Sequence, residues 1–233
     1  GGLHGFSLSE EGIRSPRDLQ TLWQADDAGG IRLSGNKGWV PLPEHCEAYF
    51  VVCRASGQDG ALSVVRMPAT ADGVSMSPRN PAAFMPELPA ARMQLQDVVL
   101  DASAMLPGDG WTDYARPFGA LEELYVSVAL MGYLLREGRA RDWPQAMLRQ
   151  MLATITLLER IAAEVESDQG LVLLAGATEW VRTLMTRATA QWAEQPEDAG
   201  GQRWARDQTV QRMWAAAGAR RGDRAWQALS PSA

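Results

Sequence analysis

The sequence is poor in several residue types, and each shortage excludes a class of protein. Its 233 residues contain two cysteines and two histidines, and its 22 basic residues include a single lysine, Lys37. Cys46 and Cys53 are seven apart on one predicted strand, and an odd spacing puts them on opposite faces, which excludes a disulfide between them. His4 and His45 match no metal-ligand spacing, so no metal site is predicted.

Positive charge and long apolar runs are also scarce. The net charge of -6 argues against a general nucleic-acid-binding protein, which would usually be basic. No stretch approaches the ~20 apolar residues that cross a bilayer, and no charged-then-apolar leader resembles a secretion signal. Hydrophobic residues make up 46% and charged residues 21% of the chain, as in ordinary globular proteins. We therefore expect a cytoplasmic protein without nucleic-acid or membrane partners.

The first half of the chain has the pattern of a β domain. Short apolar and β-branched segments alternate with turns rich in glycine, proline and aspartate, which is typical of a sandwich or barrel. The predicted strands are 19–25, 31–35, 47–54, 61–67 and 91–100. Four prolines in 78–89 indicate an extended connector. This pattern predicts a β-barrel domain over residues 1–112.

The second half has the pattern of helices. Apolar residues recur at steps of three and four on three segments. The stripes are Leu121, Leu124, Val128, Met131 and Leu135; then Met147, Met151, Ile155, Leu158 and Ala162; then Leu174, Thr178, Val181, Met185, Ala188 and Trp192. Residues 200–219 are a fourth candidate. Short loops between four helices predict an antiparallel four-helix bundle over residues 113–233. The fold class is therefore α+β multidomain.

Four segments in this order resemble the acyl-CoA dehydrogenase family. FSLSEEGIRSP (6–16) is similar to its TEPGAGSD segment, and GGIRLSGNKGWV (29–40) to its hairpin with a lysine before an aromatic residue. The run FMPELPAARMQLQDVVLDASAMLPGDG (84–110) resembles the end of its middle domain. RWARDQTVQRMW (203–214) resembles its last long helix. The resemblance covers the family's middle β-barrel and C-terminal four-helix bundle, and its N-terminal helical domain has no counterpart here.

The resemblance implies an FAD-dependent oxidoreductase that acts on the CH–CH bond of acyl-CoA thioesters. It also implies a homo-oligomer, because the family's bundles pack against each other. The missing N-terminal domain forms one wall of the flavin and acyl-CoA cavity, so a partner chain could replace it. The alternative is a non-enzymatic interaction or structural subunit built on the same scaffold.

The segment 6–16 supplies three of the implied cofactor-binding residues. In the family it holds the flavin pyrimidine edge and the acyl-CoA chain. Ser9 stands for the family threonine and keeps a hydroxyl, Ser15 stands for the family serine, and Leu8 stands for the preceding apolar residue. Three positions depart from the family: Glu11 replaces a proline, Arg14 a glycine and Pro16 an aspartate.

Trp39 is the fourth implied cofactor-binding residue. It occupies the position of the aromatic residue that lies against the flavin ring in the family. Two readings stay open: the indole stacks on the flavin ring, or it caps the open end of the barrel. Pro41 replaces a threonine that donates to the flavin, and proline has neither the hydroxyl nor an N–H for that hydrogen bond.

The catalytic base is the largest departure. α-Proton abstraction needs a carboxylate beside the thioester while the flavin takes the β-hydride. Ala215 falls on the family glutamate, and alanine cannot accept a proton. Some branches place the base on an earlier helix, so Glu122 and Glu123 are candidates; the alternative is that they only complement the helix macrodipole. We therefore expect a degenerate or incomplete enzyme that binds FAD weakly or not at all.

Overall fold

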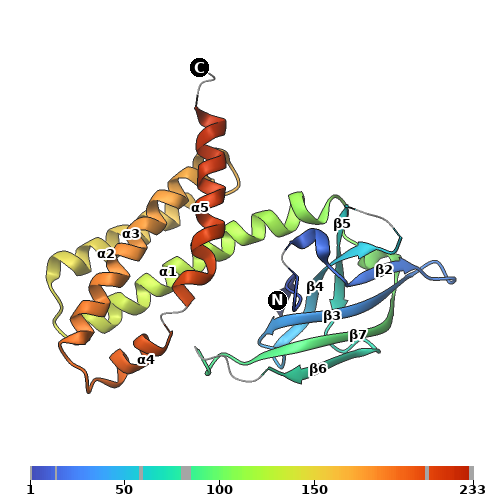
Figure 1. The fold of residues 1–233 in the computed structure, drawn as a ribbon, viewed down its shortest axis with the longest axis horizontal. Coiled ribbons are helices and arrows are strands. Elements are labelled where there is room, and N and C mark those ends of the chain that lie inside the picture. The colour runs from blue at the N-terminus through green and yellow to red at the C-terminus, as the bar shows by residue number, and fades with distance from the viewer. Residues whose placement is uncertain (1, 14, 58–59, 80–84, 208–209, 231–233) are drawn as a thin grey trace. The chain divides into compact units, whose positions relative to one another are not determined.

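The computed structural model describes residues 2–13, 15–57, 60–79, 85–207 and 210–230, without the side chains of Arg17 and of 210–217. The chain divides into two compact units, Gly1–Arg116 and Pro117–Ala233. The first contains all the strands and the second contains the long helices, as Figure 1 shows. Each unit is described by itself.

In the part of the first unit that the structure describes, seven strands form one mixed sheet. The strands are β1 (Leu3–Ser7), β2 (Leu22–Ala25), β3 (Ile31–Pro41), β4 (Cys46–Ala55), β5 (Leu62–Pro68), β6 (Val74–Pro78) and β7 (Ala90–Leu100). Their order is β1-β4-β2-β3-β7-β6, and β5 pairs with β4. β1 and β2 both pair with β4 in parallel, at its two ends. The neighbouring strands β3, β7 and β6 are antiparallel.

The α+β class is confirmed, but the sheet of the described residues is open rather than closed into a barrel. β5 forms one edge, and its outer side is taken by the segment after β7. The N–H of Leu106 donates to the carbonyl of Val64 at 2.9 Å, and Val65 bridges to Met105. A strand edge already hydrogen-bonded in this way cannot pair with β6 to complete a barrel.

Alternating burial explains most of the strands. Along β7, Ala91, Met93, Leu95 and Val98 are buried and the residues between them are exposed. β3 departs from strict alternation at two register shifts, next to Gly35 and between Lys37 and Val40. Gly35 has φ +148°, and a Cβ there would lie 2.5 Å from the Cα of Thr21. Only glycine fits, so this position brings Thr21 against the hairpin.

The described residues of the second unit form five helices: α1 (Arg116–Ala140), α2 (Gln145–Ile161), α3 (Asp168–Ala193), α4 (Ala199–Asp207) and α5 (Val210–Leu229). A short 3-10 turn and a six-residue π-helix, Gly110–Ala115, precede α1. Ser167 caps α3, because its hydroxyl accepts from the N–H of Gly170 at 3.0 Å. The predicted fourth helix, 200–219, is covered by α4 and the first half of α5.

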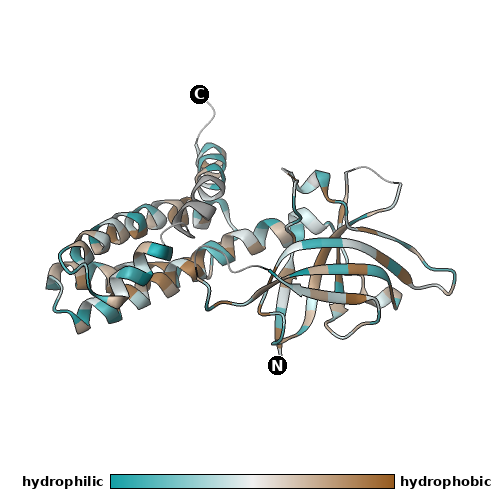
Figure 2. Cartoon of the chain, turned by 60° about the horizontal axis from the view of Figure 1, so that its bottom comes forward, coloured by the Kyte–Doolittle hydropathy of each residue, from teal (hydrophilic) through white to brown (hydrophobic). Residues whose placement is uncertain are grey.

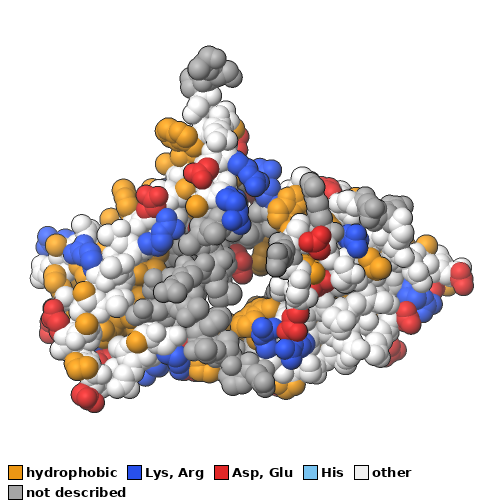
Figure 3. Space-filling view, viewed as in Figure 1, with side chains coloured by type: hydrophobic (Ala, Val, Ile, Leu, Met, Phe, Trp, Pro, Cys, Tyr) orange, Lys and Arg blue, Asp and Glu red, His pale blue; other side chains and the backbone are white. Residues whose placement is uncertain are grey.

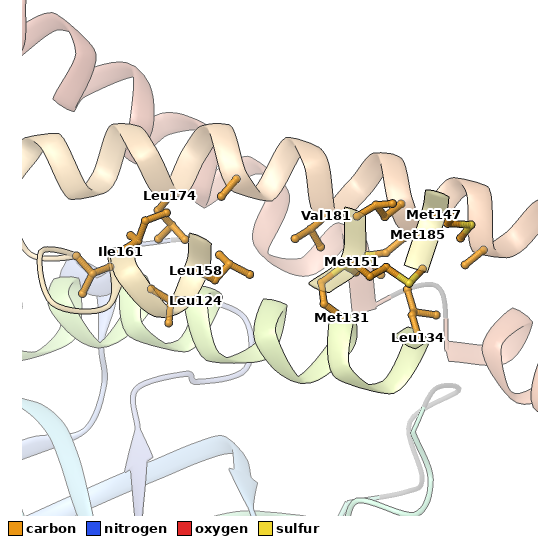
Figure 4. Packing of buried hydrophobic residues seen from close by; sticks show 14 of the residues in the cluster. Leu124, Met131, Leu134, Met147, Met151, Leu158, Ile161, Leu174, Val181 and Met185 are labelled. Carbon is orange, nitrogen blue, oxygen red and sulfur yellow. The ribbon is translucent and has the colours of Figure 1, made fainter. Parts of the chain in front are cut away.

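The predicted apolar stripes form the helical core. Figure 4 shows Leu124 and Met131 of α1 pointing toward Leu158 and Met151 of α2 and toward α3. All six predicted positions of α3 are buried: Leu174, Thr178, Val181, Met185, Ala188 and Trp192. The methionines are therefore core residues and do not line a ligand groove. Figure 2 shows the same alternation of apolar and polar faces along the helices.

Four aromatic rings close one end of this core. Trp192 of α3 lies between Trp143, with ring centroids 4.9 Å apart, and Trp204 of α4, at 5.3 Å. Tyr133 of α1 stacks on Trp204 at 6.4 Å. The indole N–H of Trp204 donates to Thr189 Oγ1 at 2.8 Å. The short helix α4 is thus held to the unit by a buried tryptophan.

Among the described residues, one helical stretch, Gly110–Ala140, is long and apolar enough to cross a membrane by length and composition. The composition of the chain did not indicate such a stretch. The core helix of a soluble protein can have the same length and apolar composition. Leu124, Met131 and Leu134 of this stretch are fully buried in the helical core.

Candidate functional site

Trp39 lies near the end of β3, half-buried, with an arginine over its ring. The guanidinium carbon of Arg79 is 5.1 Å from the ring centroid, which is a cation–π contact. Arg79 Nη1 also donates to the carbonyl of Gly38 and to Glu11 Oε1, the latter at 3.1 Å. One face of the indole is therefore covered by a charged, planar side chain of the same unit.

The segment carrying Leu8 and Ser9 packs directly on this hairpin. The N–H of Gly38 donates to the carbonyl of Ser9 at 2.9 Å. A Cβ on Gly38 would lie 2.8 Å from Glu11 Cγ, so glycine permits the close approach. Leu8 is half-buried and packs against a small buried cluster of Leu19, Val52, Leu62 and Val64. Ser9 is exposed. The structure thus brings Leu8 and Ser9 to the hairpin that carries Trp39.

A buried ion pair holds the two segments together. Lys37 is fully buried, and its Nζ donates to Glu10 Oε1 at 2.8 Å and to the carbonyl of Val52 at 2.6 Å. Glu10 also accepts from the hydroxyl of Thr21 at 2.6 Å and from the N–H of Gln20 at 2.6 Å. Burial alone would raise the pKa of Glu10, but the Lys37 ammonium and these hydrogen bonds hold that pKa below its usual value.

Glu11, next to Glu10, is exposed, and two arginines share its carboxylate. Its Oε1 accepts from Arg92 Nε of β7 at 2.8 Å and from Arg79 Nη1 at 3.1 Å. The hydrogen bond from Arg92 holds the pKa of Glu11 below its usual value. Two arginines thus share one carboxylate beside Trp39, and the three side chains carry a net positive charge.

A shallow cleft of about 540 Å³ lies on the same side of the sheet. Its lining is mixed, and its polar members include Glu11, Asn36, Ser75, Arg92 and Gln94. Glu11 comes from the segment after β1, and the other four residues come from β3, β6 and β7. The cleft borders Gly38, so it adjoins the position of Trp39 in the chain.

Glu123 is the other chemically distinctive residue, and it lies in the helical unit. It is buried on α1, forms an ion pair with Arg221 of α5, and lies against Gly218, where a Cβ would collide with its carboxylate. Burial raises the pKa of Glu123, while the charge of Arg221 opposes that rise. Arg221 also donates to the carbonyl of Gly119 at 3.1 Å.

The remaining predicted positions are less informative. Glu122 is half-buried on α1, one residue before Glu123. Ser15 is half-buried, and its carbonyl accepts from the N–H of Asp18 at 2.9 Å. Ala215 lies in α5, but its side chain is outside the part of the chain that the structure describes. Arg14 is also outside the described residues. Among the described residues, no three histidine, cysteine, aspartate or glutamate side chains cluster to hold a metal.

The fold has clear relatives among solved structures. The chain aligns with butyryl-CoA dehydrogenase from Megasphaera elsdenii at a TM-score of 0.71 and 17% identity, over 97% of this chain and 68% of that one. The fold is that of the acyl-CoA dehydrogenases. A probable acyl-CoA dehydrogenase from Mycobacterium abscessus aligns at a TM-score of 0.67 and 15% identity, over 93% and 65% of the two chains.

The relatives also include a monooxygenase. Dibenzothiophene monooxygenase from Paenibacillus sp. A11-2 aligns at a TM-score of 0.74 and 15% identity, over 97% of this chain and 69% of that one. The chain therefore spans about two thirds of the length of these structures. No protein-family profile and no curated protein sequence matches it. At these identities the likeness shows the fold alone.

Three side chains of these sites were not singled out from the sequence. Arg79 stands at the start of the predicted connector 78–89, and Arg92 and Arg221 are two among many arginines. No local signal marks them. Lys37 could have been singled out, because it is the only lysine of the chain and stands two residues before Trp39.

Proposed function

We propose that the chain is the β and C-terminal part of a flavin-dependent oxidoreductase of the acyl-CoA dehydrogenase type, with Trp39 against the flavin ring. The observation that carries the proposal is the position of Trp39 at the end of β3, where Gly38 binds the Ser9 segment. Solved structures of the same fold include an FAD complex and an FMN complex. The flavin would supply the hydride acceptor for an acyl-CoA substrate.

The residues present fit a flavin only in part. The half-buried Trp39 ring offers a stacking surface, and Ser9, whose carbonyl accepts from the N–H of Gly38, is exposed. Pro41 offers no donor where the family has a threonine. Arg79 covers one face of the indole. This mixture supports weak binding to the isolated chain and an enzyme that is incomplete without a further domain or partner chain.

Glu123 is the better of the two candidate bases. A base for α-proton abstraction must be held in place with a proton affinity above that of an ordinary carboxylate. Glu123 is buried, is positioned by Arg221, and has a raised pKa. Glu123 packs against Gly218 of α5, and Gly218 is three residues, or about one helical turn, from Ala215. Glu122 is less buried on the same helix.

The test is a titration of the purified chain with FAD and with FMN, followed by the visible spectrum and the quenching of flavin fluorescence. Trp39→Ala should weaken binding, whereas Trp180→Ala, which removes an exposed tryptophan of the helical unit, should not. Equal flavin binding by wild type and Trp39→Ala would refute the proposed role of Trp39. No flavin binding under any condition would refute the cofactor.

Activity tests the base separately. We expect the isolated chain to show no measurable dye reduction with butyryl-CoA. If a completing domain or partner restores activity, Glu123→Gln should lower the rate by roughly 10²–10⁴, the usual cost of losing a positioned general base. Glu122→Gln is the matched control and should change the rate by only a few fold.

A non-enzymatic interaction subunit is the second candidate, and exposed aromatic residues of the helical unit favour it. Tyr125, Trp180 and Trp226 are 60%, 58% and 64% exposed. Figure 3 shows apolar side chains spread over the surface of the helices. Such residues suit contact with a second copy of the chain. Sedimentation that shows only monomer at micromolar concentration would count against the homo-oligomer.

A cytoplasmic location, without nucleic-acid or membrane partners, completes the proposal.

A further inference from the structure

We propose that Arg79 is a latch on the Trp39 ring, held in place by Glu11, and that a planar ligand stacking on that face must displace it. The inference rests on the proposed flavin function of Trp39. A guanidinium whose central carbon is 5.1 Å from the ring centroid occupies the space that a second ring would need at stacking distance. Arg79 and a flavin ring therefore exclude each other from this face.

Strand register places the latch. The N–H of Arg79 donates to the carbonyl of Ala90 at 3.0 Å, which extends the β6–β7 ladder by one residue. Ala90 pairs with Pro41 of β3, two residues beyond Trp39. The backbone of Arg79 is thus fixed two strands away from the tryptophan. Its side chain crosses β7 and reaches the indole, Gly38 and Glu11 together.

Glu11 is the catch. It accepts from Arg79 at 3.1 Å and is itself oriented by Arg92 at 2.8 Å. In the family that this segment resembles, a proline stands at this position. The residue that departs from the family is therefore the one that holds the arginine over the ring. Such a latch would weaken flavin binding without loss of the stacking surface.

The latch is weak enough to open. The side chains of Arg79 and Glu11 are 32% and 53% exposed, so solvent screens their pairing. Salt at ~0.5 M shortens the electrostatic range to a few ångströms and weakens such pairs further. The backbone of Arg79 stays in the ladder when its side chain swings away. Opening therefore removes Arg79 from the indole face without unfolding the sheet.

Riboflavin is the probe, because it lacks the phosphate that an arginine would attract for other reasons. We expect Arg79→Ala to bind riboflavin about tenfold more tightly than wild type, the size of one exposed cation–π contact plus its hydrogen bonds. Glu11→Gln should give a smaller gain in the same direction. Arg66→Ala, which removes an exposed arginine of β5 outside this network, should change nothing. Raising NaCl should tighten binding by wild type and leave Arg79→Ala unaffected.

A second readout does not depend on flavin. The indole N–H signal of Trp39 in a ¹H–¹⁵N spectrum, assigned by its absence in Trp39→Phe, should shift in Arg79→Ala and in wild type at high salt. If riboflavin binds wild type and Arg79→Ala equally, the latch is wrong and the flavin function stands. If neither protein binds flavin, the flavin function is wrong, and the latch is judged by the indole signal. An indole signal unchanged by Arg79→Ala overturns the latch in either case.

Discussion

Replacing Lys37 by methionine tests the buried ion pair that joins the Ser9 segment to the sheet. Methionine has a similar length and no charge, so the change removes the ammonium and little volume. The carboxylate of Glu10 would remain, with its side chain only 4% exposed, and would still accept hydrogen bonds from Thr21 and Gln20. The carbonyl of Val52 would lose its donor at 2.6 Å.

Removing one partner of a buried pair leaves an uncompensated charge, which typically costs about 3–5 kcal/mol. We expect Lys37→Met to lower the free energy of unfolding of the β unit by this amount at pH 7. With a urea m-value of roughly 2 kcal/mol/M, the midpoint should fall by roughly 2 M. Lys37→Met combined with Glu10→Gln removes both charges and keeps an acceptor for Thr21. The double variant should therefore be more stable than Lys37→Met alone.

The deficit should depend on pH. In wild type the pKa of Glu10 is held below its usual value, so its stabilising contribution is present above the unfolded pKa and is lost as pH falls through the lower folded pKa. Without Lys37, burial raises the pKa of Glu10. The folded variant then takes up a proton more readily than the unfolded chain. Its stability relative to wild type should recover as pH falls from 7 to 4.5.

The assay is urea unfolding at the two pH values, followed by tryptophan fluorescence and by far-ultraviolet circular dichroism. The β transition should move while the helical transition stays in place, since the pair lies within the first unit. A Lys37→Met midpoint within experimental error of wild type at pH 7 would refute the reasoning. So would a double variant less stable than Lys37→Met, because that result would mean that the charge of Glu10 needs no partner.

Three further outcomes are expected. Trp204→Ala should lower the stability of the helical unit by about 3–5 kcal/mol, seen as an earlier thermal transition in circular dichroism; an unchanged transition would mean that α4 is not docked through this ring. Gly138→Ala should destabilise by about 1–3 kcal/mol, because the added Cβ would lie 2.7 Å from Leu148 Cδ2, whereas Gly132→Ala on the same helix meets nothing within 4 Å and should stabilise by ~0.5–1 kcal/mol. Lys37 should resist amine-reactive reagents in the native protein and react in urea, as peptide mass mapping would show; labelling of the native protein would contradict its burial.

The helical half was the more predictable from sequence. The α3 stripe from Leu174 to Trp192 was identified in full, because helical periodicity repeats over many residues and a long segment averages out exceptions. The strands β1 and β6 were not predicted. Each has five residues, and β6, with the sequence VSMSP, shows no buried position in its pattern, so little hydrophobic signal marks it. β1 and β6 become strands by pairing with β4 and β7, which lie elsewhere in the chain.

The candidate site was also predictable from the sequence only in part. Trp39 and the segment with Leu8 and Ser9 were singled out because contiguous residues resemble family motifs. Their roles in cofactor binding stay predictions, as does that of Ser15. The covering of Trp39 was not predictable, since Arg79 stands in what the sequence indicates is only a connector.

Local physical chemistry in the sequence determined the class of each half. Side-chain spacing decides whether a segment can bury one face as a helix or as a strand, and that spacing is written in neighbouring residues. Only the tertiary structure decided which charges meet. Register between β3 and β7 puts Arg79 over Trp39, and packing of α5 on α1 gives Glu123 its partner Arg221. The two residues of such a pair are 40 to 98 positions apart in the sequence. Their geometry depends on how the cores between them pack, and the spacing of neighbouring residues does not predict that packing.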